Sequence, residues 1–528
     1  MYKKHAACLG LLVGLLLPVS LLANQQATQD ALREAFSGHA TACTAALPAV
    51  ALQAPGLLHE FYAQRQFVPL WQDAGRRLDL LHELQQLADD GLDLAPYQLS
   101  LLQAQLQRQA DSQAEACAEL LASHSYLLAL QHLYQGRLPL EQRESLWRAE
   151  SLPASTRPSL LSIAWQGLDK VANAFAAARP SQPHYLQLRR AYASLRQQSP
   201  AEWPLIEAGR LLKPGMHDPR IPILIQRLQA DGYLPADTPS ATLYSESVAS
   251  AVRQFQQLHG LQDDAIIGAD TLAALNQPFA ARLEQLRANL ERWRWLSAEM
   301  EPDLLLVDIA GGLLSYYQGG QLQWQGRTQV GRAVRQTPQL KSRVNRLTLN
   351  PTWTVPPTIL REDKLPEIRR DIEFLARNDL QVLDQQGNLL EPYFIDWQRP
   401  GPIILRQAAG PRNPLGKLAI RFPNPFSVYL HDTPSQRLFE KSPRAFSSGC
   451  VRVEGILQLL PLLLDEAERA PLAARLDSGK TSQYNLRQPV TILMAYWTAA
   501  VDEQGRLILR KDIYARDAQL SARLRQAH

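Results

Sequence analysis

The spacing of apolar residues changes once along this chain of 528 residues, near Pro302, and the change separates two kinds of structure. Upstream, between residues 24 and 207, leucines recur at helical spacing, for example over residues 78–87 and 120–138. Downstream, short apolar runs such as residues 304–310 end at glycine pairs, which is the pattern of strands joined by tight turns. The sequence therefore predicts a multidomain α+β protein, with a helical scaffold domain over residues 24–207 and a β-rich domain after residue 302.

Length and composition narrow the class of protein. A chain this long exceeds one hydrophobic core, so about two to four domains are expected. Hydrophobic residues make up 46% and charged residues 20% of the sequence, which is typical of a folded protein and excludes a disordered one. The formal net charge is +4, and part of it comes from Lys3 and Lys4 at the N-terminus. A surplus this small does not favour a nucleic-acid partner.

The N-terminus has the pattern of a targeting segment. Lys3 and Lys4 precede an apolar run over residues 6–22, and Ala23 stands at the expected cleavage point. We interpret residues 1–23 as a secretory signal peptide. An uncleaved membrane anchor is the alternative, because the run is near the lower length limit of a membrane span. In both cases the bulk of the chain is exported.

Export limits what the cysteines can do. Once Cys8 leaves with the signal, Cys43, Cys117 and Cys450 remain, an odd number in an oxidising compartment. Cys43 and Cys117 both lie in the N-terminal third and form the candidate disulfide, so Cys450 is expected to be free. A free thiol in an exported protein is at risk of oxidation, and its presence raises the odds of a catalytic role.

Cys450 lies 19 positions after His431 and is preceded by Ser447, Ser448 and Gly449. Cysteine is a strong nucleophile only as a thiolate, and histidine can serve as the base that generates it. Gly449 allows close approach of a substrate, and the amides near Cys450 could face a developing oxyanion. The pattern predicts a thiol–imidazole pair; a buried cysteine beside a loop histidine is the alternative.

Residues 214–278 are predicted to form a separate small module. Apolar spacing predicts helices over residues 221–228 and 247–258, and Gly268 begins a third helix. The pattern resembles the peptidoglycan-binding three-helix domain, from which it departs at Ala265, because the usual turn has glycine there. A helical bundle that docks without ligand affinity is the alternative. The residues that carry the resemblance are Leu228, Tyr233, Ala251, Val252, Phe255, Gln256, Gly260, Leu261, Gly268, Thr271 and Leu275.

The β-rich domain, predicted over residues 302–516, is similar to the catalytic domain of the L,D-transpeptidases (YkuD-like). The whole arrangement is similar to the large YcbB-type subgroup, which also has serine at the position of Ser448. The resemblance implies a lid over residues 368–426 and a C-terminal strand pair, residues 490–497 with residues 506–510. The motifs are Gly331 with Thr337-Pro338, Asn350-Pro351, Trp353, Val355-Pro356, His431-Asp432-Thr433 and Ser448-Gly449-Cys450-Val451-Arg452-Val453. The remaining segments are a linker helix over residues 279–300 and a tail over residues 517–528.

The resemblance implies that Cys450 is the nucleophile and His431 the base. In this family a main-chain carbonyl orients the imidazole, and a carbonyl near Asp432 or Ser447 is the candidate. The apolar run after Val453 predicts a helix, whose N-terminus would help to hold a thiolate.

Further residues are candidates for contacts with substrate. The amide of Gly449 and the hydroxyl of Ser448 are candidates for the oxyanion hole, together with the amide of the cysteine. Arg452 can clasp the carboxylate of a diaminopimelate-bearing stem in bidentate fashion, with a structural salt bridge as the equal alternative. Tyr429 and Trp353 are candidates for lining the cleft, and core packing is the alternative for Trp353.

The implied reaction is attack on the L-diaminopimelyl–D-alanine bond of a donor tetrapeptide, release of D-alanine, and resolution of the thioester by a second diaminopimelate amine, which gives a 3→3 crosslink. The implied partners are peptidoglycan stem peptides in the periplasm, with other cell-wall synthesis enzymes as further candidates. Such enzymes are typically acylated by carbapenems. No cofactor is implied, and the exported histidines and cysteines show no zinc spacing.

An L,D-carboxypeptidase that uses water as acceptor and a non-catalytic wall-binding protein are the alternatives. An NlpC-like peptidase is excluded, because it would need a histidine after the cysteine and the sequence has none between Cys450 and His528.

Overall fold

The computed structural model describes residues 19–36, 56–106, 111–150, 152, 157–198 and 204–526. The described residues fall into two compact units, one within residues 1–139 and 158–181, the other within residues 140–157 and 182–527. Most of the predicted signal peptide lies outside the described residues. Across the described ranges, no helix is long and apolar enough to cross a membrane.

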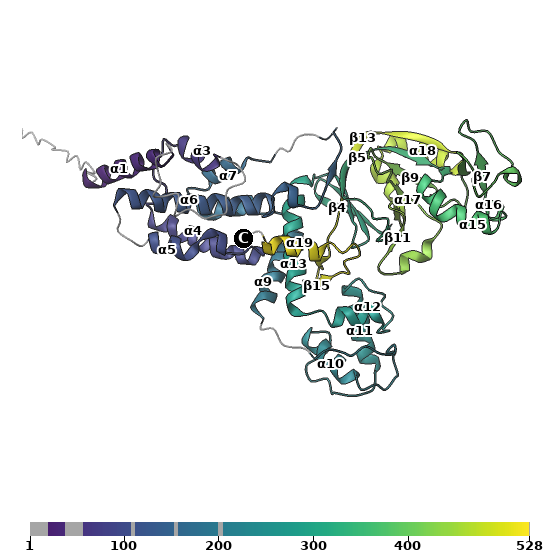
Figure 1. The fold of residues 1–528 in the computed structure, drawn as a ribbon, viewed down its shortest axis with the longest axis horizontal. Coiled ribbons are helices and arrows are strands. Elements are labelled where there is room, and N and C mark those ends of the chain that lie inside the picture. The colour runs from purple at the N-terminus through teal and green to yellow at the C-terminus, as the bar shows by residue number, and fades with distance from the viewer. Residues whose placement is uncertain are drawn as a thin grey trace, which may run out of the picture. The chain divides into compact units, whose positions relative to one another are not determined.

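The first unit is a set of helices around α6 (Ser112–Gln135), as Figure 1 shows. Most α6 side chains are buried, which is expected of a helix surrounded on all sides. Glu119 on α6 accepts the N–H groups of Leu70 (2.8 Å) and Trp71 (2.7 Å) and so holds the segment before α4 against the core. The other helices are α1 (Val19–Phe36), α3 (Leu57–Ala63), α4 (Ala74–Gln86), α5 (Leu99–Leu106), α7 (Leu160–Gln166) and α8 (Val171–Ala178).

Cys117 lies on α6 and is disulfide-bonded. Its predicted partner, Cys43, lies outside the described residues, so the Cys43–Cys117 pairing stays a prediction. Cys450 is a free cysteine.

The three predicted helices of the small module are confirmed as α10 (Ile221–Ala230), α11 (Glu246–Leu258) and α12 (Ala269–Leu275). Ala265 has a φ of +59°, so alanine occupies the left-handed conformation that glycine would adopt more easily. Its N–H donates to Gln256 Oε1 at 2.9 Å, which holds the turn against α11.

The predicted linker helix is α13 (Phe279–Leu296). α9 (Pro183–Gln197) packs on α13, and Tyr185 and Leu290 are buried in the same apolar cluster. We predicted α9 as part of the scaffold over residues 24–207; in the structure it belongs to the second unit, because this apolar face packs there.

The β-rich domain is built on a ten-stranded mixed sheet in the order β1-β5-β13-β2-β3-β4-β12-β10-β9, with β11 paired to β4. β9 also pairs with β5. The strands β5, β13, β2, β3, β4, β12, β10 and β9 therefore close into a ring around the apolar core. Closure leaves no open edge between these strands. The strands are β1 (Trp147–Arg148), β2 (Leu304–Asp308), β3 (Leu313–Gln318), β4 (Gln321–Gly331), β5 (Leu340–Leu349), β9 (Leu418–Arg421), β10 (Leu430–His431), β11 (Ala445–Ser447), β12 (Val451–Val453) and β13 (Ser482–Ala495).

The predicted pairing of residues 490–497 with residues 506–510 is wrong. β13 pairs with β5 on one side and with β2 on the other, so both of its edges are occupied. Instead, β14 (Ala499–Val501) pairs with β15 (Leu507–Leu509). The helices of this region are α17 (Ile456–Leu459), α18 (Glu466–Asp477) and α19 (Asp517–Gln526).

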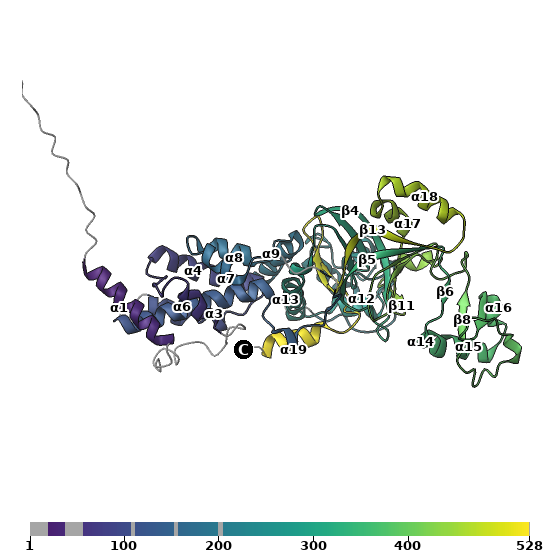
Figure 2. The ribbon, with the colours of Figure 1, turned by 90° about the horizontal axis from the view of Figure 1, so that it is seen from above.

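Residues 353–407 form a small subdomain with its own core, which we call the cap (Figure 2). The predicted lid boundaries, residues 368–426, differ from it at both ends. Strand β6 (Trp353–Thr354) already pairs with β8 inside the cap, and β9 pairs with β5 and β10 in the main sheet. The cap consists of β6, α14 (Pro357–Ile359), a π-helical turn (Leu360–Lys364), α15 (Leu365–Arg370), α16 (Phe374–Arg377), β7 (Leu380–Leu383) and β8 (Ile404–Gln407).

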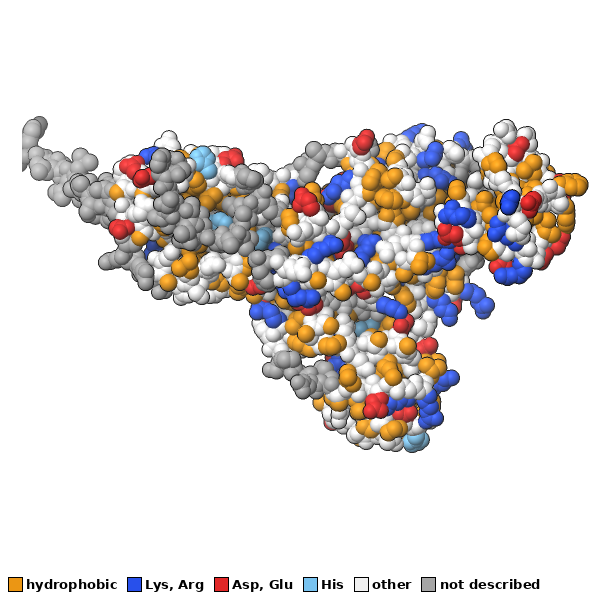
Figure 3. Space-filling view, viewed as in Figure 1, with side chains coloured by type: hydrophobic (Ala, Val, Ile, Leu, Met, Phe, Trp, Pro, Cys, Tyr) orange, Lys and Arg blue, Asp and Glu red, His pale blue; other side chains and the backbone are white. Residues whose placement is uncertain are grey.

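The cap also carries apolar side chains on its surface, and Figure 3 shows such side chains over it. Phe394 is 90% exposed, and Leu389 and Tyr393 are exposed beside it in the sequence. These three residues are therefore not part of the cap core.

Candidate active site

The sheet brings His431 and Cys450 onto neighbouring strands. β10 and β12 are parallel, with Leu430 opposite Val451 and His431 opposite Arg452. Cys450 immediately precedes β12, so the register places it beside the residue before Leu430, and the Val451 N–H donates to that residue's carbonyl at 3.1 Å. The thiol and the imidazole thus come from adjacent strand ends, although the sequence separates them by a loop.

The His431 ring is buried, with 4% of the residue exposed. Its Nδ1 lies 2.5 Å from the Asp432 carbonyl, which can only accept, so Nδ1 carries the hydrogen and Nε2 is left as an acceptor. Burial, and then the charge of Arg452, lower the pKa of His431 to about 3, against the opposing effect of the Asp432 and Pro414 carbonyls. The imidazole is therefore neutral near pH 7, the state that a general base requires.

Of the two candidate positions for the orienting carbonyl, near Asp432 and near Ser447, the structure has the Asp432 carbonyl in contact with the ring. The Asp432 carboxylate points elsewhere and accepts the N–H of Lys417 at 2.9 Å.

The thiol of Cys450 donates to the Ser427 carbonyl, with Sγ 3.7 Å from the oxygen. Burial raises the pKa of Cys450, while the N–H and hydroxyl of Tyr429 and the charge of Arg421 act in the opposite direction. No hydrogen bond joins the described side chains of Cys450 and His431. The resting pair therefore consists of a neutral thiol and a neutral imidazole.

Two arginines stand near the thiol without a carboxylate partner among the described residues. Arg452 Nη1 donates to Gln329 Oε1 at 3.1 Å, and its buried Nε makes no hydrogen bond. The Arg421 guanidinium lies 4.5 Å from the centre of the Tyr429 ring, and its Nε donates to Thr348 Oγ1 at 3.1 Å. The salt bridge considered as the alternative for Arg452 is not formed within the described chain.

Hydrogen bonds fix the loop before Cys450. The Gly449 N–H donates to Ser447 Oγ at 3.1 Å, and the Gly449 carbonyl accepts from the Thr337 hydroxyl at 2.9 Å. Ser448 Oγ is 2.9 Å from Nη1 of Arg335. The amide of Gly449 and the hydroxyl of Ser448 are therefore engaged within the protein, whereas the Cys450 N–H has no partner among the described residues.

The helix predicted after Val453 begins farther from the thiol than expected. Residues after Cys450 form β12, Gly455 adopts a φ of +64°, and α17 starts only at Ile456. Because a helix terminus acts over about one turn, α17 does not support the thiolate.

The remaining predicted residues lie in different places. Tyr429 is at the site, with its ring centre 5.5 Å from that of His431. Trp353 packs against the cap core, and Lys364 Nζ lies 5.5 Å from its ring centre. Sequence reasoning missed Arg421 and Arg335, which come from segments distant from the Cys450 motif and carried no local signal.

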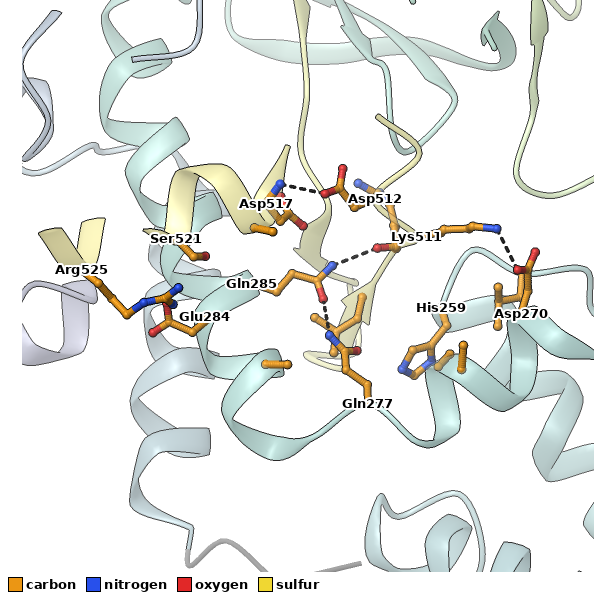
Figure 4. A pocket seen from close by; sticks show the side chains of 17 residues that line it. His259, Asp270, Gln277, Glu284, Gln285, Lys511, Asp512, Asp517, Ser521 and Arg525 are labelled. Atoms are coloured by element: carbon orange, nitrogen blue, oxygen red, sulfur yellow. Dashed lines mark hydrogen bonds and ion pairs between the residues drawn. The ribbon is translucent and has the colours of Figure 1, made fainter. Parts of the chain in front are cut away.

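A cavity of about 520 Å³ lies away from Cys450 and His431 (Figure 4). It is lined by the small module, α13 and the C-terminal segment, including His259, Gln285 and Lys511, and by none of the predicted site residues. Within the described part of the chain, no group of three or more His, Cys, Asp or Glu side chains could hold a metal ion.

Comparisons with known proteins give three family matches. Residues 56–191 match a scaffold domain, residues 217–275 match a domain described as "Putative peptidoglycan binding domain", and residues 302–491 match the L,D-transpeptidase catalytic domain, YkuD.

A curated protein of Haemophilus influenzae, described as "Putative L,D-transpeptidase", is 35% identical over 246 residues, which cover 45% of this chain and 49% of that protein. The match thus spans about half the length of this relative. A crystal structure of the L,D-transpeptidase from Xylanimonas cellulosilytica aligns with a TM-score of 0.18 and 16% identity, over 55% of this chain and 98% of that chain. These matches confirm the predicted resemblance: residues 302–491 are similar to the L,D-transpeptidase catalytic domain, YkuD, and residues 217–275 to the peptidoglycan-binding domain.

Proposed function

We propose that this protein is an exported L,D-transpeptidase that forms 3→3 crosslinks between peptidoglycan stem peptides through a thioester on Cys450. One observation carries the proposal: a neutral imidazole, fixed through Nδ1 on the Asp432 carbonyl, stands on the strand next to the free thiol. The matches to a transpeptidase domain and a peptidoglycan-binding domain support the substrate class.

In the first half-reaction His431 Nε2 takes the proton of Cys450, and the thiolate attacks the carbonyl of the L-diaminopimelyl–D-alanine bond. The oxyanion is held by the Cys450 N–H, which has no hydrogen-bond partner among the described residues. As the C–N bond breaks, His431 returns the proton to the amine, D-alanine leaves, and the thioester remains.

In the second half-reaction the side-chain amine of another diaminopimelate attacks the thioester. His431 takes the proton of the amine and gives it to the departing sulfur, which restores the thiol and leaves the 3→3 amide bond.

The charges at the site suit an acidic stem peptide. Arg452 and Arg421 carry positive charge beside the thiol and have no carboxylate partner among the described residues. A stem carboxylate could therefore bind there without displacing an internal one. The same charges favour the thiolate over the thiol and disfavour protonation of His431.

The direct test uses purified tetrapeptide muropeptides, with the products identified by mass spectrometry. We expect crosslinked dimers and free D-alanine from the wild type, and neither from Cys450→Ala or from Cys450→Ser, which keeps the shape of the side chain with a weaker nucleophile. Tripeptides without dimers would assign the protein as an L,D-carboxypeptidase, and unchanged products from Cys450→Ala would refute the role of the thiol.

A further inference from the structure

Arg335 connects the cap to the loop that carries Cys450. Its Nη1 donates to Ser448 Oγ at 2.9 Å and to Asp363 Oδ2 at 2.6 Å. Its Nη2 donates to Asp363 Oδ1 at 2.9 Å and to Glu362 Oε2 at 2.7 Å. The side chain is 12% exposed. One guanidinium thus holds a cap carboxylate in bidentate fashion and, at the same time, the hydroxyl two residues before the thiol.

The backbone of Arg335 is part of the same rigid piece as that loop. The Arg335 N–H donates to the Arg332 carbonyl at 2.8 Å, and a Cβ added to Gly331 would meet the Arg335 carbonyl at 2.1 Å. The Thr337 hydroxyl accepts the Gly331 N–H and donates to the Gly449 carbonyl. From this piece two side chains reach the cap: Arg335, through its short bonds to Asp363 and Glu362, and Arg332, whose Nη2 lies at the longer distance of 3.4 Å from Asp363 Oδ1.

On the other side, the two acidic residues belong to the π-helical turn Leu360–Lys364. π-helical turns are rare in proteins, and those that occur are often found at functional sites. Lys364 Nζ lies 5.5 Å from the ring centre of Trp353 and 5.3 Å from that of Phe374, which ties the turn to the cap core. Asp363 is therefore fixed to the cap and changes position only when the cap does.

We propose that Arg335 is a positioning residue for acyl transfer, which binds the cap through Asp363 and couples the seating of the cap to the placement of the Ser448–Cys450 loop. An arginine suits this role because its planar fork can bind a carboxylate through two N–H groups and still donate to a hydroxyl, whereas a lysine offers a single point. The inference rests on the proposed function. It predicts that the cap and the loop lose their order together when the fork is removed.

The test measures two quantities on the full chain: kcat and KM with the donor tetrapeptide, and hydrogen exchange in peptides covering residues 357–370 and 445–452. We expect kcat to fall at least about tenfold in Arg335→Gln and in Asp363→Asn, with KM changed by less than about threefold, because the misplacement affects the reacting loop. Exchange should become faster in both segments in both variants.

Three further variants sharpen the test. Arg335→Lys should show the same loss of kcat and the same faster exchange as Arg335→Gln, because a lysine keeps the charge but not the two-pronged guanidinium. The charge-swapped protein with both Arg335→Asp and Asp363→Arg should recover part of the lost kcat, which a purely structural defect would not. The matched control is Arg370→Gln, which removes an exposed ion pair to Glu367 in the same cap and should leave kcat and exchange unchanged.

A wild-type kcat in Arg335→Gln, or faster exchange in the cap alone with residues 445–452 unchanged, would overturn the inference. The exchange experiment needs no turnover, so it separates this inference from the proposed function. A wild type that releases no D-alanine would contradict the function, while uncoupled exchange would contradict the role of Arg335.

Discussion

The Thr337 hydroxyl allows a prediction whose magnitude follows from two hydrogen bonds. The residue is fully buried, and Oγ1 accepts the Gly331 N–H at 2.8 Å while it donates to the Gly449 carbonyl at 2.9 Å. Thr337→Val keeps the shape of the side chain and removes both bonds. Each buried backbone group left without a partner costs about 1–3 kcal/mol, and burial of a methyl group in place of the hydroxyl offsets about 1 kcal/mol.

We therefore expect Thr337→Val to destabilise this region by about 1–5 kcal/mol, with a central value of about 3 kcal/mol. At about tenfold for each 1.4 kcal/mol, the central value raises the population of the open state about 100-fold. Hydrogen exchange of the full chain, in peptides covering residues 326–340 and 445–453, measures this population directly. Thr337→Ser is the matched control, because it keeps the hydroxyl and loses one methyl group, at a cost of about 1 kcal/mol.

The reasoning also requires that the two peptides respond together, since the hydroxyl bridges them. Equal protection in Thr337→Val and Thr337→Ser, or faster exchange near Gly331 with no change near Gly449, would refute it.

Two titrations and one substitution provide further predictions. Because the fold lowers the pKa of His431 from 6.5 to about 3, the unfolded chain binds this proton more tightly; the unfolding free energy should fall as pH drops from about 6.5 towards 3, and urea titrations of His431→Gln should show less of this loss. Burial raises the pKa of Glu119 from 4.5 to about 7, so its contribution is complete below about pH 4.5 and is lost as pH rises through 7; hydrogen exchange on α6 should quicken over that range in the wild type and less so in Glu119→Gln. Tyr429→Phe removes a hydroxyl that lowers the pKa of Cys450, so alkylation of the thiol by iodoacetamide at pH 7.5 should slow severalfold, and an unchanged rate would count against that contact.

Periodicity was sufficient for elements whose structure depends on their own residues. The helices of the module were predicted within about two residues of their observed ends, because the apolar spacing that defines each helix lies within its own residues. The pairing of residues 490–497, which the resemblance implied, was wrong: a strand does lie there, but its partners are set by the whole sheet, and β13 already has two. The apolar run after Val453 does form a helix, α17, but this helix starts only at Ile456, because β12 and the turn at Gly455 separate it from Cys450.

The residues of the candidate site also differ in whether a local sequence pattern identifies them. His431 and Cys450 lie in short motifs that the sequence shows directly. Arg421 and Arg335 reach the site because β9 closes the sheet and because a turn after β4 packs under the loop, and neither arrangement has a local signature. The carbonyl that orients the imidazole was open between two candidates for the same reason, because backbone groups carry no sequence signal.

The acyl-enzyme is the central claim, and mass spectrometry of the digested protein tests it most directly. The full chain is incubated with a donor tetrapeptide in the absence of an acceptor, quenched in acid and digested. We predict a mass increase equal to the donor minus D-alanine, located on the peptide that contains Cys450 and absent from Cys450→Ser. An unmodified wild type that still releases D-alanine, or an adduct located on another residue, would contradict the account.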